Sequence, residues 1–158
     1  MKRLLVLLVL IESFAAFAQS GKATSPKSAK PFALLIRSKP VVAVGTPIEI
    51  HIRLTNTSAH DIDASSVHQG TGFCPTYIYG IHDQSGNAAQ QKRSEQESPG
   101  SLQTRMLKPG ASREDSCLIS DAFDMWTGTY AVQLSKPVSD SPGAELVKSN
   151  KITITVTP

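Results

Sequence analysis

Between Ile48 and Leu54 the chain alternates apolar and polar residues without a break. One side of this stretch would carry Ile48, Ile50, Ile52 and Leu54. The other side would carry Glu49, His51 and Arg53. Because the side chains of a β-strand point alternately to its two faces, this pattern predicts a strand with one buried side and one solvent-facing side.

Shorter apolar runs recur along the rest of the chain. We predict further strands over residues 32–37, continued at 41–44, and over residues 61–67, 74–83, 102–107, 114–120, 129–134 and 151–157. Pro40 interrupts the first run, which indicates an edge strand able to switch between sheets. Gly and Pro turns separate the runs, and no helical periodicity follows residue 18. The pattern predicts an all-β antiparallel sandwich of about seven or eight strands.

Two long connections stand out between the predicted strands. Residues 84–101 contain no large apolar residue and are predicted to form a polar loop. Residues 136–143 contain Pro137 and Pro142 and are predicted to form a second loop. Loops as long as the first are often functional or mobile, so both are candidate contact segments.

Residues 1–18 have the pattern of a secretory signal peptide. Basic Lys2 and Arg3 precede an apolar run at 4–11, and Ala16 and Ala18 are the small residues that a signal peptidase requires. The run is too short to span a membrane, which takes about 20 apolar residues. A buried N-terminal helix is the alternative interpretation.

The remaining chain divides into a linker and one domain. Residues 19–31 contain no large apolar residue, so we expect them to be a flexible linker. Residues 32–158 are expected to form a single domain. With cleavage near Ala18, the mature protein is expected to be exported, to the periplasm or fully out of the cell.

Charge and composition argue against nucleic acid as a partner. The net charge is only +3, the Lys and Arg residues are not clustered on any one stretch, and aromatic residues make up 6% of the chain. A nucleic-acid-binding surface would show a concentrated basic patch. The same distribution gives no reason to expect a membrane surface as the partner.

The two cysteines, Cys74 and Cys117, are predicted to form a disulfide. Exported proteins meet an oxidising environment, in which a pair of cysteines is most simply a bridge. Closing a loop of this length stabilises the fold by about 4 kcal/mol on the chain-entropy model. A catalytic thiol is the alternative, but no histidine is placed beside either cysteine by sequence.

The residues that could bind metals do not form a recognisable site. His51, His60, His68 and His82 show none of the spacings typical of paired metal ligands. Aspartates such as Asp61 and Asp63 lack the spaced oxygen pattern of a calcium loop, and turn capping is the favoured interpretation. We therefore predict no metal-binding or cofactor-binding residues.

Motifs of nucleophilic catalysis and phosphate binding are also missing from the sequence. The chain contains no Gly-x-Ser-x-Gly motif, and Gly70-Thr71-Gly72 lacks the third glycine of a phosphate-binding loop. We predict no catalytic residues and no enzyme activity. Asn56-Thr57-Ser58 matches the acceptor sequence for N-glycosylation, which matters only in a host that glycosylates.

Aromatic residues offer the remaining candidates for a contact surface. Tyr77, Tyr79 and Trp126 could form an aromatic patch, since exposed aromatic side chains are typical of binding surfaces. Filling of the core is the alternative, and it is the favoured interpretation for Trp126 and Tyr130. Tyr77 and Tyr79 therefore remain the possible contact aromatics.

Three short motifs resemble the immunoglobulin-like sandwich modules of exported bacterial proteins. They are Gly45-Thr46-Pro47-Ile48-Glu49-Ile50, Leu107-Lys108-Pro109-Gly110 and Gly128-Thr129-Tyr130-Ala131-Val132. The resemblance covers residues 32–158 and implies the fold while leaving the activity open. A weaker resemblance is to the fold of intracellular-type bacterial proteinase inhibitors, without a matching inhibitory loop.

The sequence departs from antibody-type domains in its cysteines and tryptophan. Trp126 follows both cysteines, whereas antibody domains place a tryptophan between them. The predicted disulfide is therefore expected to tie the region around Cys74 to the strand that carries Cys117, rather than to pin the two central strands together.

These observations predict a non-catalytic exported binding or structural module of unknown specificity. Its expected partner is a protein or a component of the cell envelope. The alternative is a proteinase inhibitor that presents residues 84–101 or 136–143 to an active site. A third possibility, an enzyme or metal carrier, has the least support from the residues.

Overall fold

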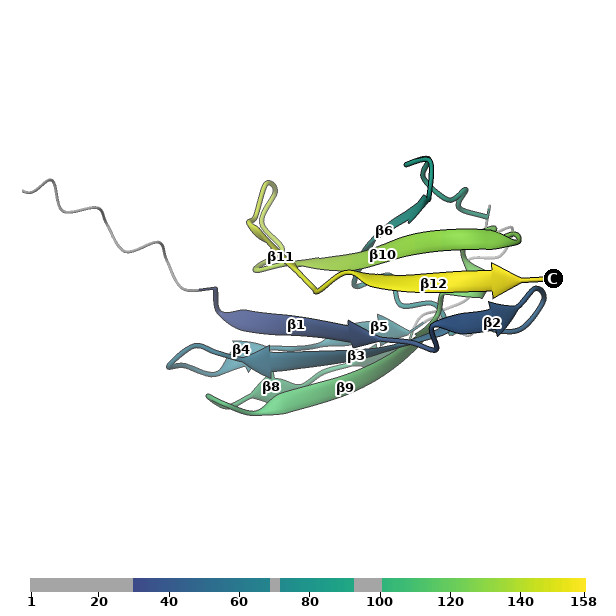
Figure 1. Ribbon diagram of the computed structural model, residues 1–158. Coiled ribbons are helices and arrows are strands. Elements are labelled where there is room, and N and C mark those ends of the chain that lie inside the picture. The colour runs from purple at the N-terminus through teal and green to yellow at the C-terminus, as the bar shows by residue number, and fades with distance from the viewer. Residues whose placement is uncertain (1–29, 69–71, 93–100) are drawn as a thin grey trace, which may run out of the picture.

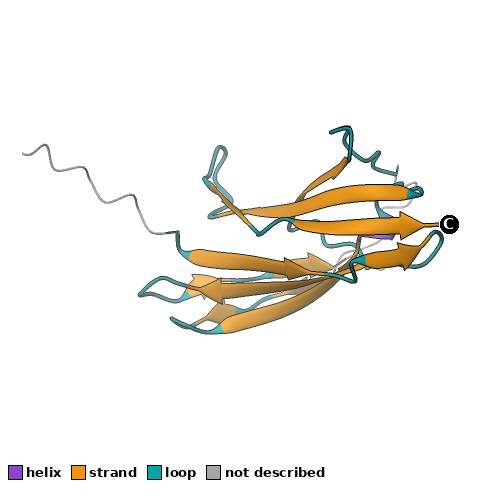
Figure 2. Ribbon diagram, in the orientation of Figure 1, coloured by secondary structure: helices purple, strands orange, loops and turns teal. Residues whose placement is uncertain are grey.

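The computed structural model describes residues 30–68, 72–92 and 101–158, and these residues form an all-β protein (Figures 1 and 2). The described chain contains β-strands β1 to β12 and one short 3-10 helix, η1 (Ile119–Asp121). None of its helices is long and apolar enough to cross a membrane. The predicted signal peptide and most of the predicted linker, residues 1–29, lie outside the described residues.

The first main sheet has the order β1 (Phe32–Arg37), β3 (Glu49–Asn56) and β9 (Ser112–Leu118). All neighbours in it are antiparallel. The predicted alternation along β3 is confirmed, since Ile50, Ile52 and Leu54 are buried while the residues between them face outward. One face of this sheet therefore supplies core, as its period of two requires.

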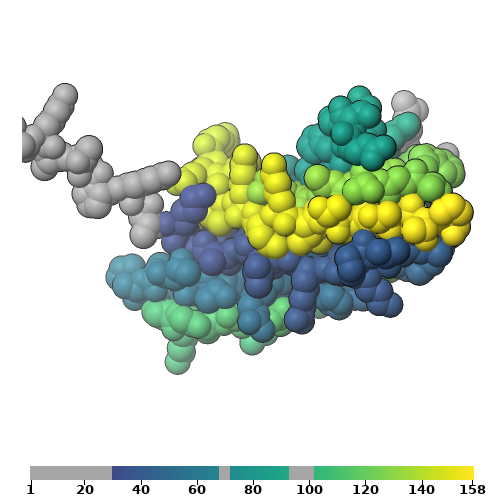
Figure 3. All heavy atoms as spheres, in the orientation of Figure 1, coloured from purple at the N-terminus to yellow at the C-terminus, as the bar shows by residue number. Residues whose placement is uncertain are grey.

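The second main sheet is centred on β10 (Gly128–Pro137). β6 (Ile78–Asp83) pairs with one edge of β10, and β11 (Leu146–Lys148) and β12 (Ile152–Thr157) pair with the other. β2 (Val41–Ala43) then runs parallel to β12 and completes this curled sheet. In Figure 3 the yellow C-terminal strand lies directly against the blue segment that contains β2.

The first apolar run switches between sheets at Pro40, as predicted from the sequence. β1 pairs with β3 in the first sheet, and β2 pairs with β12 in the second. The side-chain amide of Asn150 joins the same two layers, because it accepts a hydrogen bond from the Ile36 N–H at 2.8 Å and donates one to the Ile36 carbonyl at 3.0 Å. The amide thus takes the place of a neighbouring strand at this edge of β1.

Two short strand pairs complete the fold and correct the prediction of seven or eight strands. The predicted strand at 61–67 is two strands, β4 (Ile62–Asp63) and β5 (Ser66–His68). The predicted strand at 102–107 is likewise divided into β7 (Ser101–Gln103) and β8 (Met106–Leu107). β4 pairs with β8, and β5 pairs with β7. The break between β4 and β5 therefore lies opposite the break between β7 and β8.

Three other boundaries differ from the prediction. The strand expected over 74–83 begins only at Ile78, because Pro75 and Thr76 form a turn. The strand expected over 114–120 gives way to η1 after Leu118. β11 was not predicted at all, since its three residues carry too little pattern to separate them from a loop.

The hydrophobic core lies between the two main sheets. Ile50 and Ile52 of β3 face Val132 and Leu134 of β10, Ile154 of β12 belongs to the same cluster, and all five are completely or almost completely buried. Figure 2 shows the strands of the two layers stacked one above the other. The regular alternation in β3, β10 and β12 is therefore explained by a core shared between the layers.

Replacing Ile52 by Ala tests this assignment of faces. The side chain is fully buried, so we expect the free energy of unfolding to fall by about 2–5 kcal/mol. His51→Ala is the matched control. The side chain of His51, which precedes Ile52 in β3, is partly exposed, so its truncation should lower the free energy of unfolding much less. Chemical denaturation of both variants measures the difference, and equal costs would show that the register of β3 is wrong.

Candidate functional site

The predicted disulfide between Cys74 and Cys117 is present in the structure. The two sulfur atoms are 2.01 Å apart and the two Cα atoms 5.7 Å apart. Both residues are fully buried. Cys74 lies in the connection that precedes β6 and Cys117 lies in β9, so the bridge ties a connecting segment to the edge of the first sheet, as predicted.

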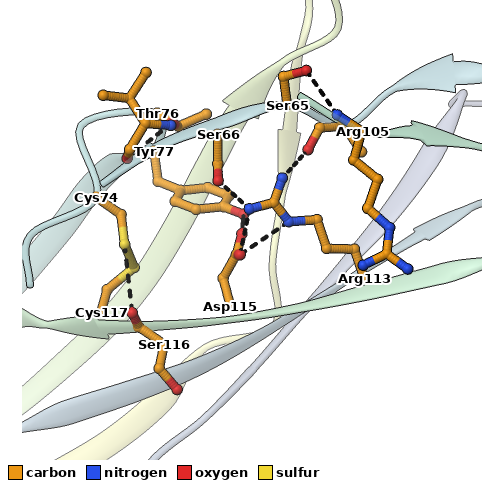
Figure 4. Close-up of polar contacts among 12 residues, drawn as sticks. Ser65, Ser66, Cys74, Thr76, Tyr77, Arg105, Arg113, Asp115, Ser116 and Cys117 are labelled. Carbon is orange, nitrogen blue, oxygen red and sulfur yellow. Dashed lines mark hydrogen bonds and ion pairs between the residues drawn. A yellow bond between two sulfur atoms is a disulfide. The ribbon is translucent and has the colours of Figure 1, made fainter. Parts of the chain in front are cut away.

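A buried ion pair lies beside the disulfide (Figure 4). Arg113 and Asp115 both point inward from β9, and their side chains are only 3% and 4% exposed. Arg113 Nη2 lies 2.5 Å from Asp115 Oδ1, and Arg113 Nε donates to the same oxygen at 2.9 Å. Because a buried charge without a partner is strongly destabilising, these contacts make the pair compatible with the interior.

The remaining groups of the ion pair are bonded to the segment between β4 and β6. Arg113 Nη1 donates to the Ala64 carbonyl, and Arg113 Nη2 donates to Ser66 Oγ. Tyr77 Oη donates to Asp115 Oδ2 at 2.7 Å. No buried side-chain nitrogen or oxygen among the described residues is left without a hydrogen bond. The network was not predicted, because charged residues usually mark the exposed face of a strand.

The structure places the two predicted contact aromatics inside the molecule. Tyr77 is 4% exposed, and burial together with the nearby Asp115 charge raises the pKa of its hydroxyl. Tyr79 is partly buried, and its hydroxyl donates to the Cys74 carbonyl at 3.0 Å. Burial also raises the pKa of Tyr79. The alternation that puts Tyr77, Tyr79 and Ile81 on one side thus directs that side toward the core, and these rings do not form an outer patch.

Trp126 shows the opposite correction, since core filling was the favoured interpretation for it. Its side chain is 70% exposed. Phe123 fills the interior instead, where its ring packs 5.5 Å from the ring of Tyr79. Tyr130 is buried, and its hydroxyl accepts a hydrogen bond from the Trp126 backbone N–H at 2.9 Å. That bond fixes the connection before β10 with the indole outside.

Trp126 borders a hollow of about 340 Å³ at one end of the molecule, which we call the tryptophan pocket. Its walls come from two connections, the turn between β2 and β3 and the segment between η1 and β10. Val44, Pro47, Phe123 and Met125 give it an apolar lining. Asp121 and Asp124 lie at the same place, so the pocket combines an exposed indole with carboxylates.

A second hollow, of about 650 Å³, lies at the opposite end, and we call it the lysine cleft. Phe32 at the start of β1 and Lys136 to Asp140 in the hairpin between β10 and β11 border it. Figure 1 shows these elements at one end and the turn after β2 at the other. Lys136 is partly buried, and its Nζ lies 5.9 Å from the centre of the Tyr77 ring.

The electrostatic surroundings of Lys136 lower the pKa of its ammonium group. Burial is the main cause, and the positive charge of Arg113 acts in the same direction. The carboxylates of Asp140 and Asp63 oppose the shift. Hydrogen bonds from Ser65 lower the pKa of Asp63, so this carboxylate remains ionised near neutral pH. The lysine cleft therefore holds a poorly solvated cation between two anions.

The histidines and aspartates do not assemble a metal site in the described part of the chain. Within it, no group of three or more His, Cys, Asp or Glu side chains could hold a metal ion. His51 instead contacts Ser116 Oγ at 2.9 Å and Glu49 at 3.7 Å. Asp63 accepts a hydrogen bond from the Ser65 N–H at 2.8 Å, which is the turn capping that was predicted. The side chain of His68 lies outside the described residues.

The glycosylation sequon serves the fold at Asn56. This residue is 1% exposed, and its Nδ2 donates to the carbonyls of His60 and Leu107 at 2.7 and 2.8 Å. Its Oδ1 accepts from the Ser58 N–H at 2.9 Å and from Ser58 Oγ at 2.8 Å. The nitrogen that a glycan would modify is thus occupied inside the folded protein.

The two segments proposed as inhibitory loops differ in what the structure shows. Residues 93–100 of the first lie outside the described residues. In the second, Lys136 and Pro137 belong to β10 and pair with Val147 and Leu146 of β11. The Val138 N–H then donates to the Glu145 carbonyl at 2.9 Å, which makes this segment a hairpin end rather than an extended loop.

Comparison with known proteins does not identify the chain. No protein-family model matches it, and no curated protein matches it significantly.

Replacing Arg113 by Met tests the contribution of the buried ion pair. The change removes the guanidinium that pairs with the buried Asp115 carboxylate, so we expect the free energy of unfolding to fall by about 3–5 kcal/mol. Arg53→Met is the matched control, because Arg53 of β3 pairs with Glu114 on the exposed face of β9, and its loss should cost about 1 kcal/mol or less. Urea denaturation compares the two, and similar costs would contradict the importance of burial.

A second substitution, Asn56→Ala, tests the corner after β3. The carbonyls of His60 and Leu107 would lose their donor, so we expect a loss of about 2 kcal/mol or more in the free energy of unfolding. Asn87→Ala provides the control, since Asn87 is exposed and bonded only to the surface residue Asp83. Thermal unfolding of both proteins measures the difference. A small effect of Asn56→Ala would mean that water replaces the amide.

Proposed function

We propose that this protein is an exported, non-catalytic immunoglobulin-like module that recognises a protein or cell-envelope partner through the tryptophan pocket. The observation that carries this proposal is the exposure of Trp126 beside that pocket. Trp is among the residues most enriched where a few side chains supply most of the binding energy.

The strand order supports an immunoglobulin-like arrangement. β1, β3 and β9 form one layer, while β2, β12, β10 and β6 follow one another across the second. The Tyr130 hydroxyl bonded to the Trp126 backbone resembles the tyrosine corner of such domains, in which a tyrosine at the start of a strand bonds the preceding connection. The disulfide departs from the usual pattern, because it joins β9 to the segment before β6 instead of two central strands.

The chemistry of the described residues supports binding rather than catalysis. The ion pair of Arg113 and Asp115 is buried and fully bonded, so it stabilises the fold and does not face a substrate. The histidines whose side chains are described are at least partly exposed, and His51 contacts the surface residue Ser116. A reactive site would instead bring a base, a nucleophile and an orienting group together in a hollow.

Export is supported by the disulfide and by the signal-peptide pattern. A buried disulfide forms and persists in an oxidising compartment. Residues 1–18 have the basic, apolar and small-residue order of a secretory signal. Both features point to a periplasmic or secreted protein, and a partner is therefore to be sought in those compartments.

Trp126→Ala tests the proposed surface with a pull-down from periplasmic and secreted fractions, using mature protein with its disulfide intact. We expect the wild-type protein to retain a stoichiometric partner and Trp126→Ala to weaken that complex by about thirtyfold, as for a residue worth roughly 2 kcal/mol. Because the indole is 70% exposed, the stability of the variant should remain close to wild type.

Ile78→Ala is the matched control for this experiment. Ile78 is another exposed apolar side chain, but it lies on β6 away from the tryptophan pocket, and its loss should leave binding unchanged. Equal binding by wild type and Trp126→Ala would refute the proposed surface. Inhibition of a protease panel by the wild-type protein at micromolar concentration would favour the inhibitor alternative instead.

A further inference from the structure

The lysine cleft offers a second binding site, independent of the tryptophan pocket. It lies at the other end of the molecule and shares no lining residue with that pocket. Its volume of about 650 Å³ falls within the roughly 300–1,000 Å³ typical of small-molecule sites. Size and position therefore allow a small ligand that does not compete with a partner bound at Trp126.

The carboxylates of Asp63 and Asp140 share this cleft with Lys136. Among the described residues, no carboxylate oxygen forms an ion pair with Lys136 Nζ, whereas Arg53 and Arg113 each have one. Lys136 Nζ lies 5.9 Å from the centre of the Tyr77 ring. A partly buried ammonium with no carboxylate in direct contact gains more from an incoming carboxylate than a fully hydrated one does.

The walls of the cleft restrict which anion can enter. Asp63 and Asp140 line it together with Lys136, so the formal charge of the lining is 1 − 2 = −1. A phosphate or a dicarboxylate would bring two or more negative charges next to these aspartates and be repelled. A ligand that carries an ammonium as well as a single carboxylate matches both signs.

An apolar contact surface lies beside the charged groups. Leu102 borders the cleft and is 65% exposed, and Val67 and Val138 are partly buried on the same lining. Covering these side chains with an aliphatic group removes apolar surface from water, which is favourable. The cleft therefore combines a cation, two anions and an apolar wall.

We propose that the lysine cleft binds a small apolar zwitterion, an aliphatic amino acid or a dipeptide of such residues. The carboxylate pairs with Lys136, the ammonium faces Asp63 and Asp140, and the aliphatic side chain lies against Leu102. Recognition uses the three kinds of group that meet at this hairpin. This binding does not involve Trp126 and does not depend on the partner sought in the pull-down. The proposal and the proposed function can therefore fail separately.

The test is a calorimetric and NMR titration of the mature protein with four probes. Leucine and leucyl-leucine carry both charges, N-acetylleucine lacks the ammonium, and leucinamide lacks the carboxylate. We expect leucine or leucyl-leucine to bind and the two blocked compounds to bind about tenfold more weakly or worse, because hydrogen bonds between charged groups contribute at least that factor. The stronger of the two zwitterions identifies whether an amino acid or a dipeptide fits.

Two variants and one control connect the binding to the named residues. Lys136→Met should weaken the zwitterion about tenfold or more, whereas Lys148→Met, on the exposed face of the neighbouring strand β11, should have no effect. Asp140→Asn should weaken the binding of leucine, because the Asp140 carboxylate attracts the ammonium of this probe. The same change should strengthen the binding of N-acetylleucine, because the Asp140 carboxylate repels its carboxylate and no ammonium is present. A purely structural role of Asp140 would change both affinities in the same direction.

The outcomes decide the proposal in either direction. Binding of a zwitterion that depends on Lys136, with the opposite effects of Asp140→Asn, supports it. Absence of binding by both zwitterions at about 10 mM, beyond the millimolar range of weak ligands, would overturn it. So would equal affinity for N-acetylleucine and leucine, or an affinity unchanged by Lys136→Met in protein that unfolds at the wild-type temperature.

Discussion

The inward face of β9 carries the constraint on which the rest of the structure depends. Arg113, Asp115 and Cys117 occupy successive inward positions, and each is joined to the described part of one connecting segment, residues 64–68 and 72–77. Arg113 binds near its start, while Asp115 and Cys117 bind near its end. A strand at the edge of a sheet is thereby fixed to the segment that crosses to the second sheet, through an ion pair, a tyrosine and a covalent bond.

This fastening explains how the segment keeps its position with little regular structure. β4 and β5 are only two and three residues long, and strands so short contribute little stability by themselves. The buried guanidinium supplies hydrogen bonds to Ala64 and Ser66 that a longer strand would otherwise provide. Because the lysine cleft is built on this segment, its shape depends on the same buried groups, and the Tyr77 ring beneath Lys136 is held by Asp115.

The sequence predicts the parts of the fold in which one face is apolar and the other polar. β1, β3 and β12 are found where the alternation predicts them, and the switch at Pro40 follows from the chemistry of proline. β9 could not be assigned in the same way. Both of its faces carry charged residues, and only the tertiary structure shows that Arg113 and Asp115 face inward while Glu114 faces solvent.

The two hollows could be predicted from the sequence even less well than the strands, because each hollow brings together residues from distant segments. Asp63, Leu102 and Lys136 show no shared spacing, and they meet only in the folded protein, where the pairing of β5 with β7 places Leu102 opposite Val67 of the same cleft. The core assignment of Tyr130 is confirmed, but Tyr77 and Trp126 were assigned to the wrong sides for a related reason. Composition distinguishes aromatic from aliphatic residues, but burial is decided by which of Phe123 and Trp126 the connection before β10 turns inward.

The Tyr130 hydroxyl accepts a hydrogen bond from the Trp126 backbone N–H, and the indole of Trp126 lies outside the core. Phe123 already fills the interior next to Tyr79, so the core gains nothing from the indole. Single exposed apolar residues are common on protein surfaces, but Trp126 adjoins Val44 and Met125 around a hollow. A buried tyrosine is therefore bonded to the backbone of the residue whose large apolar side chain lies in water, and the exposure of this side chain adds nothing to the core.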